Sequence, residues 1–371
     1  MRIESPRVHD VAVVGGGVAG LSLTRALARA GADVVLVERT ALGAPHRGAS
    51  SLPLALLNPW RGRKGAAHPD DLRGLATAWR WSEALAAEGL EPGAHRSGLV
   101  RIATSARQAR AWSDRAAREP SLRWLPPGML GAPYHAPFGA LRVVDGGRID
   151  APRWMASLAA SARAHGSTLR SGTEVRGLVQ RPDAVWELRR AAVVGVDDVR
   201  AEGDVVARAR LVASCVGADA APEGVRQDGR RITWPERVRT RGEVVTLSGG
   251  PALPWPVAGG VYGAADRGTA WVGGGHRHPD QDDPSAPERL RAAFAWSAPA
   301  MAHTDVAAVW SGVRAKVPEA RPQVLRLAPG LWSFGAFAGR GFLCAADEAE
   351  AWASRWRAGA LDAGPHRPRG T

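Results

Sequence analysis

The first forty residues of the chain combine two apolar runs with a turn of glycines. The runs occupy 11–14 and 34–37, and residues 21–31 between them are mostly apolar or small. Short apolar runs bounded by turn residues are typical of buried strands, and a helix is the usual connection between parallel strands. We therefore predict a strand, a glycine turn, a helix and a second strand within residues 1–40.

Later segments carry apolar residues at helical spacing. This spacing predicts helices over 72–90, 106–118, 150–165 and 287–294, and a closing helix after the glycines near 340. Asp150 suits the N-cap of the third of these helices because its carboxylate can accept a backbone N–H, and Gly166 suits the C-terminal cap. Pro120 ends the second helix.

Alternating or continuous apolar runs predict the remaining strands. We predict strands over 98–103 and 210–218, an extended segment over 167–178, and two short strands within 186–208 around a turn near Asp197 and Asp198. Several strand candidates separated by Gly and Pro occupy 237–276, and 308–356 begins with strand, loop and strand. Residues 43–65, rich in Gly, Ser and Pro, predict a loop.

Composition places the chain among ordinary globular proteins. Its 371 residues suffice for one large domain or two intimate ones, and 45% are hydrophobic and 23% charged. The first ten residues lack the apolar core of a secretory signal, and no run is long enough to predict a membrane span. Cys215 and Cys344 are too few for a disulfide framework, so we expect a reduced, cytoplasmic location.

The formal net charge of +13 leaves two interpretations open: contact with a polyanion such as nucleic acid, or a solvated basic surface. Only Lys64 and Lys316 are lysines, so nearly all of the 49 basic residues are arginines spread along the chain. The densest clusters are Arg61, Arg63 and Lys64; Arg230 and Arg231; and Arg237, Arg239 and Arg241.

The glycine turn has the spacing G-x-G-x-x-G of a dinucleotide site. Gly15 allows the tight turn, Gly17 lets a pyrophosphate approach the backbone, and Gly20 lets the following helix lie close to the strand. Glu38 lies 18 residues beyond Gly20, at the end of the second strand, where a carboxylate accepts hydrogen bonds from the ribose hydroxyls of adenosine. That carboxylate repels a 2′-phosphate, which argues against NADP.

Five segments in this order resemble the D-amino-acid oxidase superfamily of flavoproteins. The resemblance is to the glycine oxidase and sarcosine oxidase types, and to the oxidase half of the bifunctional enzyme that matures 5-carboxymethylaminomethyl groups on the tRNA wobble uridine. The segments are 11–38; 47–59, which contains Gly48-Ala49-Ser50; 146–153 with 173–175; 212–217; and 310–322 with 337–344. Together they span nearly the whole chain.

The resemblance implies an α/β fold with a Rossmann-like, glutathione-reductase-like FAD-binding domain and an interleaved α+β substrate domain built on a mixed sheet. It predicts an FAD-binding domain from 1–90, 143–225 and 308–360, a substrate domain from 91–142 and 226–307, and a flexible tail at 361–371. FAD is expected to be non-covalent, since Trp310 and Ser311 stand where some relatives carry a linking cysteine, and no metal is expected. The implied FAD contacts are Gly15, Gly17, Val18, Ala19, Gly20, Glu38, Arg39, Ser50, Ser51, Ala55, Leu56, Val175, Gly217, Gly339, Arg340, Gly341 and Phe342.

The resemblance also indicates the catalytic residues. Oxidation of an amine moves a hydride from the carbon bearing nitrogen to flavin N5, so the protein must mainly orient the substrate. Arg314 matches the arginine that clamps the substrate carboxylate, although an ion pair with Glu319 or another acid is the alternative. Tyr262 either supports that carboxylate or packs across strands. His276 matches a pocket-lining position from which it would accept the amine proton, and Arg340 meets either the flavin or solvent.

The favoured function is oxidation of a glycine-like or N-substituted glycine, with imine hydrolysis and O2 as electron acceptor; no membrane is involved. The alternative is a stand-alone oxidase of the tRNA wobble-uridine carboxymethylaminomethyl group, since the chain carries no methyltransferase half. For that substrate, Trp60, Arg61, Arg63 and Lys64 would supply a stacking and phosphate-binding rim. A third hypothesis is a flavin-binding protein without catalysis.

Overall fold

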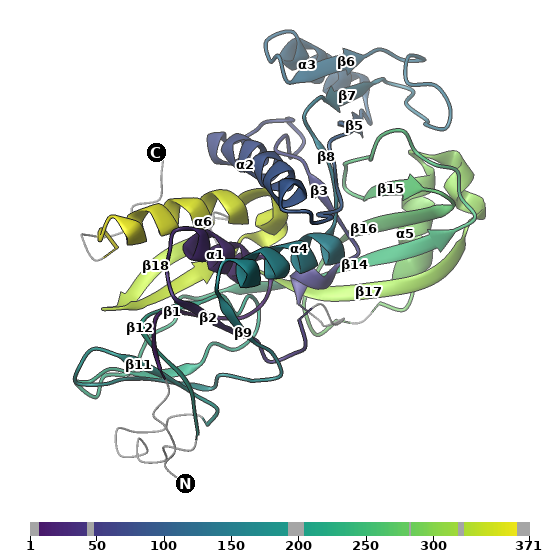
Figure 1. Ribbon diagram of the computed structural model, residues 1–371. Coiled ribbons are helices and arrows are strands. Elements are labelled where there is room, and N and C mark those ends of the chain that lie inside the picture. The colour runs from purple at the N-terminus through teal and green to yellow at the C-terminus, as the bar shows by residue number, and fades with distance from the viewer. Residues whose placement is uncertain (1–6, 43–47, 192–203, 282, 318–322, 362–371) are drawn as a thin grey trace.

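The computed structural model describes residues 7–42, 48–191, 204–281, 283–317 and 323–361. The predicted turn at Asp197 and Asp198, Glu319, and all but the first residue of the predicted tail lie outside these ranges. Two bodies built on separate sheets stand side by side (Figure 1).

The larger body is a nine-stranded mixed sheet with the order β13-β10-β11-β12-β1-β2-β9, to which β19 and β18 attach through β12. The parallel pairing of β1 with β2 and with β12 forms its centre. Its strands are β1 (Val8–Val14), β2 (Val34–Val37), β9 (Thr168–Arg170), β10 (Gly177–Gln180), β11 (Trp186–Arg189), β12 (Val205–Ser214), β13 (Glu223–Val225), β18 (Gln323–Ala328) and β19 (Leu331–Gly335).

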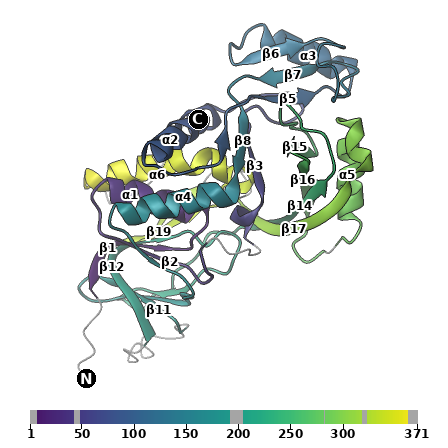
Figure 2. The same ribbon diagram turned by 45° about the vertical axis from the view of Figure 1, so that its right-hand side comes forward.

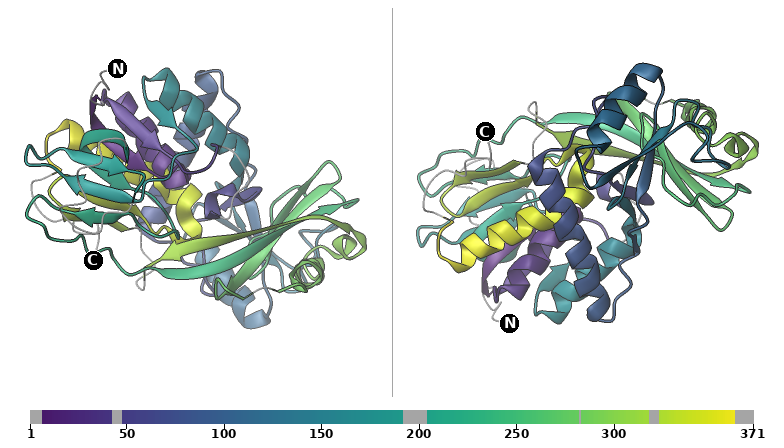
Figure 3. Two further views of the ribbon diagram at one scale, coloured as in Figure 1. Left: turned by 90° about the horizontal axis from the view of Figure 1, so that it is seen from below. Right: turned by 90° about the horizontal axis from the view of Figure 1, so that it is seen from above.

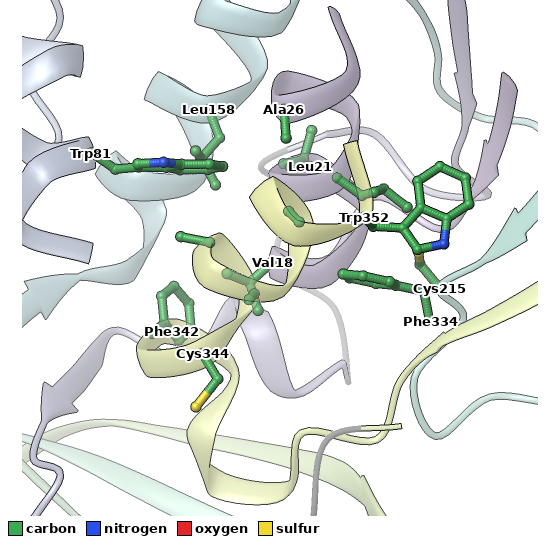
Figure 4. Close-up of a cluster of buried hydrophobic side chains, with 14 of the residues drawn as sticks. Val18, Leu21, Ala26, Trp81, Leu158, Cys215, Phe334, Phe342, Cys344 and Trp352 are labelled. Atoms are coloured by element: carbon green, nitrogen blue, oxygen red, sulfur yellow. The ribbon is translucent and has the colours of Figure 1, made fainter. Parts of the chain in front are cut away.

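Four helices form a layer over one face of this sheet (Figure 2). They are α1 (Val18–Arg29), α2 (Pro69–Ala87), α4 (Ala151–Ala164) and α6 (Gly341–Arg357). Their apolar faces share one core with β1 and β2, in which Leu21, Trp154 and Trp352 are 2% exposed or less. Figure 4 shows α6 at the centre of this core, with Val18 of α1 beside it and Phe342 in its own first turn. This core fixes the glycine turn against the start of α6.

The smaller body is a four-stranded antiparallel sheet with the order β15-β16-β14-β17. Its strands are β14 (Val238–Ser248), β15 (Tyr262–Asp266), β16 (Thr269–Arg277) and β17 (Asp305–Lys316), and α5 (Ala286–Ala295) packs on one face, as Figure 3 shows; η4 (Pro299–His303) follows α5. Leu290 and Phe294 of α5 are 1% exposed or less because they pack on Val245 and Val272 of the sheet.

Two three-stranded antiparallel sheets complete the fold. One contains β3 (Leu54–Leu57), β8 (Gly147–Asp150) and β4 (Ala94–His95), next to the short helix η1 (Ala49–Ser51). The other contains β5 (Leu99–Ile102), β7 (Ala140–Val143) and β6 (Leu122–Leu125), with α3 (Ala106–Ala116). Backbone hydrogen bonds of Val100 with Pro256 and Ala258 tie the second of these sheets to the chain beside the four-stranded sheet.

The mixed α/β fold expected from the sequence is confirmed. The N-cap is also confirmed, because Asp150 Oδ1 accepts the N–H of Arg153 at 3.0 Å. The prediction of a loop throughout 43–65 is wrong for β3, because Leu54–Leu57 pairs with the distant β8. The domain boundaries stay a prediction; β17 joins the four-stranded sheet through β14. Within the described part of the chain, no helix has both the length and the apolar character that a membrane crossing requires.

Candidate active site

A cavity of about 610 Å³ extends from the glycine turn to the four-stranded sheet. It is lined by the ends of β1 and β2, by the segment around η1 and β3, by β14, β15 and β17, and by the start of α6. Among the described residues, every predicted site residue lines it except Gly20, Ser51, Arg340 and His276. Segments far apart in the sequence therefore converge on one site.

The glycine turn has the geometry that its sequence predicted. Gly15 has φ +105°, and a Cβ there would lie 2.8 Å from the carbonyl oxygen of Cys215. A Cβ at Gly20 would collide with the carbonyl oxygen of Gly15, so Gly20 sets the close packing of α1 without lining the cavity. Both positions therefore require glycine.

Glu38 lies at the end of β2 and lines the cavity. Its Oε2 accepts the N–H of Gly16 at 2.6 Å, while Oε1 accepts the backbone N–H and the hydroxyl of Thr40 at 2.9 and 2.8 Å. These bonds orient the carboxylate beside the turn. Arg39 pairs with Asp219 at 2.9 Å, and both residues line the same end of the cavity.

The two serines of the predicted pyrophosphate loop differ in their contacts. Ser50 Oγ accepts the N–H of Val18 at 3.0 Å, at the N-terminus of α1. Ser51 Oγ instead donates to the carbonyl oxygen of Gly48 and accepts the indole N–H of Trp310, both at 3.0 Å. Ser50 therefore faces the predicted pyrophosphate site, and Ser51 anchors the loop to β17.

The residues at this end of the cavity fit the dinucleotide half of FAD. The N-terminus of α1 opens on the cavity at Gly17, and its first turn contains no acidic residue. A Cβ at Gly17 would lie 3.1 Å from Ser50 Oγ, in the space where a phosphate would meet bare backbone. Partial positive charge at a helix N-terminus favours an anion at this point. Glu38 would hold the ribose.

Arg314 on β17 lines the other end of the cavity. Its Nη2 donates to the carbonyl oxygen of Gly275 at 2.6 Å, and the guanidinium lies against Gly242, where a Cβ would be 2.9 Å from Nη2. Desolvation lowers the pKa of Arg314. Among the described residues, no carboxylate lies within ion-pair distance of it; Glu319 of the predicted alternative lies outside them. Arg314 is therefore a partly desolvated cation facing the cavity.

Tyr262 on β15 lies beside Arg314 in the cavity lining. Its ring covers Gly273, its register partner on β16, and any side chain at Gly273 would collide with that ring. Burial raises the pKa of Tyr262, so its hydroxyl stays protonated at neutral pH. The cross-strand packing that the sequence offered as one alternative is therefore present, Tyr262 also lines the cavity, and its support of a substrate carboxylate stays a prediction.

His276 is exposed and is not among the described residues that line the cavity. Its Nδ1 lies 3.3 Å from Arg314 Nη2. Desolvation, together with the positive charges of Arg314 and Lys316, lowers the pKa of His276. A neutral imidazole in this place accepts a hydrogen bond from Arg314, so the contact orients the guanidinium.

Arg340 is 6% exposed and lies beneath the site rather than in its lining, which excludes the solvent position offered as one alternative. Its Nη1 lies 3.3 Å from Oδ1 of Asp71, a residue of α2 that is 1% exposed. Arg61 pairs with the other oxygen of Asp71, and Cys344 Sγ donates to Oδ1 at 3.5 Å. Burial raises the pKa of Cys344, so this thiol stays protonated.

The structure contradicts one sequence prediction about the site and shows one further residue in the site that was not predicted. Trp60 is 3% exposed, so it cannot supply the predicted stacking rim for a nucleotide. Arg101, which no motif singled out, is 6% exposed and lines the cavity. The sequence feature that could have identified Arg101 is its position as a charged residue inside the otherwise apolar strand Leu99–Ile102.

A glycine turn with a carboxylate at the end of the second strand, joined to a chamber that contains an arginine, is typical of flavin-dependent oxidoreductases. The chain belongs to the family of FAD dependent oxidoreductases named DAO, whose model matches residues 10–351.

Comparisons with curated proteins agree with this family assignment. The chain is 28% identical over 352 residues to the tRNA 5-methylaminomethyl-2-thiouridine biosynthesis bifunctional protein MnmC of Maricaulis maris, a match covering 94% of this chain and 52% of that protein. The chain thus spans about half the length of the curated relatives it matches.

Solved structures share the fold. Glycine oxidase from Geobacillus kaustophilus matches with a TM-score of 0.75 at 20% identity, covering 96% of both chains. Iminodiacetate oxidase from Chelativorans sp. BNC1 matches with a TM-score of 0.74 at 22% identity, covering 96% of this chain and 97% of that one.

Proposed function

We propose that this protein oxidises the C–N bond of a glycine-like or N-substituted glycine. The observation that carries the proposal is Arg314, a cation that faces the cavity with no described carboxylate within ion-pair distance of it; Glu243, which lines the same cavity, interacts with it only at longer range. A guanidinium of this kind suits a substrate carboxylate, because its planar fork donates two parallel hydrogen bonds. Similarity to glycine oxidase and iminodiacetate oxidase supports the same substrate class.

The residues of the chain would position the substrate and exclude water. Arg314 holds the carboxylate, and the protonated hydroxyl of Tyr262 is a second donor beside it. Leu52, Leu56 and Phe342 add apolar surface to the cavity. FAD, when bound, supplies the acceptor of the hydride from the carbon beside nitrogen. The resulting imine takes up water and separates into an amine and an aldehyde acid, and O2 receives the two electrons to give hydrogen peroxide.

We further propose that FAD is held without a covalent bond. Cys344 is buried against Asp71 and lies outside the described cavity lining, and burial raises the pKa of both Cys344 and Cys215. A protonated, buried thiol is a poor nucleophile. Acid precipitation of the yellow protein should release all flavin into the supernatant; flavin in the pellet would contradict the proposal.

The substrate class is tested by anaerobic bleaching of the bound flavin. Glycine, sarcosine, D-amino acids and proline form the panel, and loss of the visible flavin band reports electron transfer without involving O2. Bleaching by glycine or sarcosine is expected. Bleaching confined to proline or to D-amino acids with larger side chains would overturn the proposed substrate class.

A second candidate substrate is a modified wobble uridine of tRNA. It is favoured by the match to curated relatives named for tRNA 5-methylaminomethyl-2-thiouridine biosynthesis, which covers more than 90% of this chain. Arg63 and Lys64 are exposed beside Arg61 and Gly62 of the cavity lining, where they can meet phosphates. The same bleaching assay with tRNA carrying carboxymethylaminomethyl-uridine tests it, with unmodified tRNA as the control.

A further inference from the structure

Arg101 differs from the other deeply buried arginines of the described chain. Arg25 pairs with Glu88 at 2.9 Å, Arg189 with Glu187 at 2.5 Å, and Arg340 with Asp71 at 3.3 Å. Arg101 is equally buried, at 6% exposed, but no described carboxylate lies within ion-pair distance of it. Burial alone lowers the pKa of Arg101 to about 10.

The surroundings of Arg101 satisfy only part of its guanidinium. Nη2 donates to the carbonyl oxygen of Gly62 at 2.6 Å, and the guanidinium carbon stacks 4.6 Å from the ring centre of Trp112. Nη1 is buried beside Gly65, where a Cβ would lie 3.3 Å from it, and it has no hydrogen-bond partner in the part of the chain that the structure describes. A buried charge without a counter-ion, and a buried donor without an acceptor, are both costly, which suggests that a ligand completes the site.

Arg101 lines the same cavity as Arg314, from a different sheet. Arg101 comes from β5, while Arg314 comes from β17 of the four-stranded sheet. Arg101 and Arg314 thus reach the chamber from two different sheets, and Arg39, Arg61, Arg239 and Arg241 also line it. A glycine-like substrate carries a single carboxylate, which one arginine satisfies.

We propose that Arg101 binds a second carboxylate, located on the N-substituent of the substrate, while Arg314 binds the glycine carboxylate. This inference rests on the proposed function and narrows it to dicarboxylic secondary amines. A small-molecule anion is favoured over an RNA phosphate, because Arg101 lies beneath the hairpin bridged between Arg61 and Ala66 and is almost wholly shielded from solvent.

The test uses two thioethers that lack nitrogen and so cannot react as amines. Thiodiacetate carries two carboxylates, and (methylthio)acetate carries one. Their dissociation constants are measured on the holoenzyme from changes in the visible flavin spectrum. Wild type should bind thiodiacetate about 10-fold to 100-fold more tightly, as expected for a charged hydrogen bond in a buried site.

Variants assign this preference to Arg101. Arg101→Gln should abolish the preference for thiodiacetate while leaving the affinity for (methylthio)acetate within about twofold of wild type. Arg101→Lys keeps the positive charge and should therefore retain part of the preference. Arg142→Gln is the matched control: Arg142 lies opposite Val100 in the strand beside β5 and stacks on Trp255 at 4.8 Å, but it is outside the described cavity lining. The Arg142→Gln variant should prefer thiodiacetate over (methylthio)acetate by the same factor as wild type.

The outcomes separate this inference from the proposed function. Equal binding of both thioethers by wild type, or an unchanged preference in Arg101→Gln, overturns the role of Arg101 even if sarcosine bleaches the flavin. If Arg101→Gln does not fold, the wild-type preference and the Arg101→Lys variant decide the question. An effect of Arg101→Gln on RNA affinity alone also overturns it. If no amine bleaches the flavin but the thioether preference depends on Arg101, the oxidase proposal fails and the anion site stands.

Discussion

The guanidinium of Arg314 donates a hydrogen bond of 2.6 Å to the carbonyl oxygen of Gly275. This bond orients the cation with a neutral backbone group rather than a carboxylate, so the positive charge remains available to a ligand. Gly275 has φ +94°, a left-handed conformation that glycine adopts without strain, and the resulting turn of β16 aims its carbonyl at Arg314. The substrate end of the cavity thus depends on a backbone feature of the neighbouring strand.

Replacing Arg314 by leucine should lower kcat/KM for the carboxylate substrate by about two to four decades. Loss of one partner from a buried ion pair costs roughly 3–5 kcal/mol, because the remaining charge is desolvated and unpaired. Flavin content should stay near wild type, since the predicted FAD contacts are retained. An amine without a carboxylate serves as the control substrate. Equal losses for both substrates would show that Arg314 is structural.

Protonation of His276 should lower the free energy of unfolding in mild acid. The pKa of His276 is lowered in the folded protein by partial desolvation and by the positive charges of Arg314 and Lys316, so the unfolded chain binds the proton first as pH falls. Its stabilising contribution is therefore complete above the ordinary histidine pKa of about 6.5 and is lost as pH falls through that value towards the lower folded pKa. Between pH 7.5 and 5, wild type should lose more unfolding free energy than His276→Gln, as measured by urea denaturation. If the unfolding free energies of wild type and His276→Gln fall by the same amount over this pH range, the prediction is refuted.

Glu38→Gln should weaken FAD binding by about 10-fold to 100-fold, the effect of losing charged hydrogen bonds to the ribose. The amide also places a donor against the N–H groups of Gly16 and Thr40, which now meet carboxylate oxygens. Titration of the apoprotein with FAD measures the change. Glu174→Gln is the control, because Glu174 lines the same cavity but pairs with the exposed Arg176. Equal affinities for the two variants would place the ribose elsewhere.

Asp71→Ala should reduce the unfolding free energy by about 3–5 kcal/mol, because it removes a carboxylate that is 1% exposed and pairs with both Arg61 and Arg340. Asp70→Ala, one position earlier in α2, should cost less than about 1 kcal/mol, since Asp70 pairs with the half-exposed Arg73. Chemical denaturation of the two holoproteins gives the comparison. A similar loss for both would show that the buried pair contributes no more than a surface pair.

If tRNA is the substrate, the double variant Arg63→Ala/Lys64→Ala should weaken tRNA binding and flatten its salt dependence. Each phosphate contact adds about 0.9 or less to the slope of log affinity against log salt, so the slope should fall by about 1 to 2. Arg61 is left in place because it pairs with the buried Asp71. Fluorescence anisotropy at several salt concentrations measures both quantities. Undetectable binding by wild type would favour the small-molecule substrate.

The sequence alone determined the geometry of the glycine turn and the place of the carboxylate beside it. The glycine turn and Glu38 belong to one local unit, β1-α1-β2, in which the spacing along the chain fixes the geometry. Glycine is required at position 20 by a backbone contact within that unit, and at position 15 by a contact with Cys215, the residue after β12. Such requirements produce a glycine spacing that is visible in the sequence.

Only the tertiary structure decided the charges around the substrate chamber. No spacing in the sequence indicates the roles of Arg101 and Asp71, or the pairing of Arg340 with Asp71, because each depends on which distant segment lies opposite. Asp71 accepts from Arg340, which is 269 positions later, and Arg101 faces the cavity only because β5 is tied to the segment beside the four-stranded sheet. The energy of a buried charge depends on the groups packed around it, and only the folded chain brings those groups together.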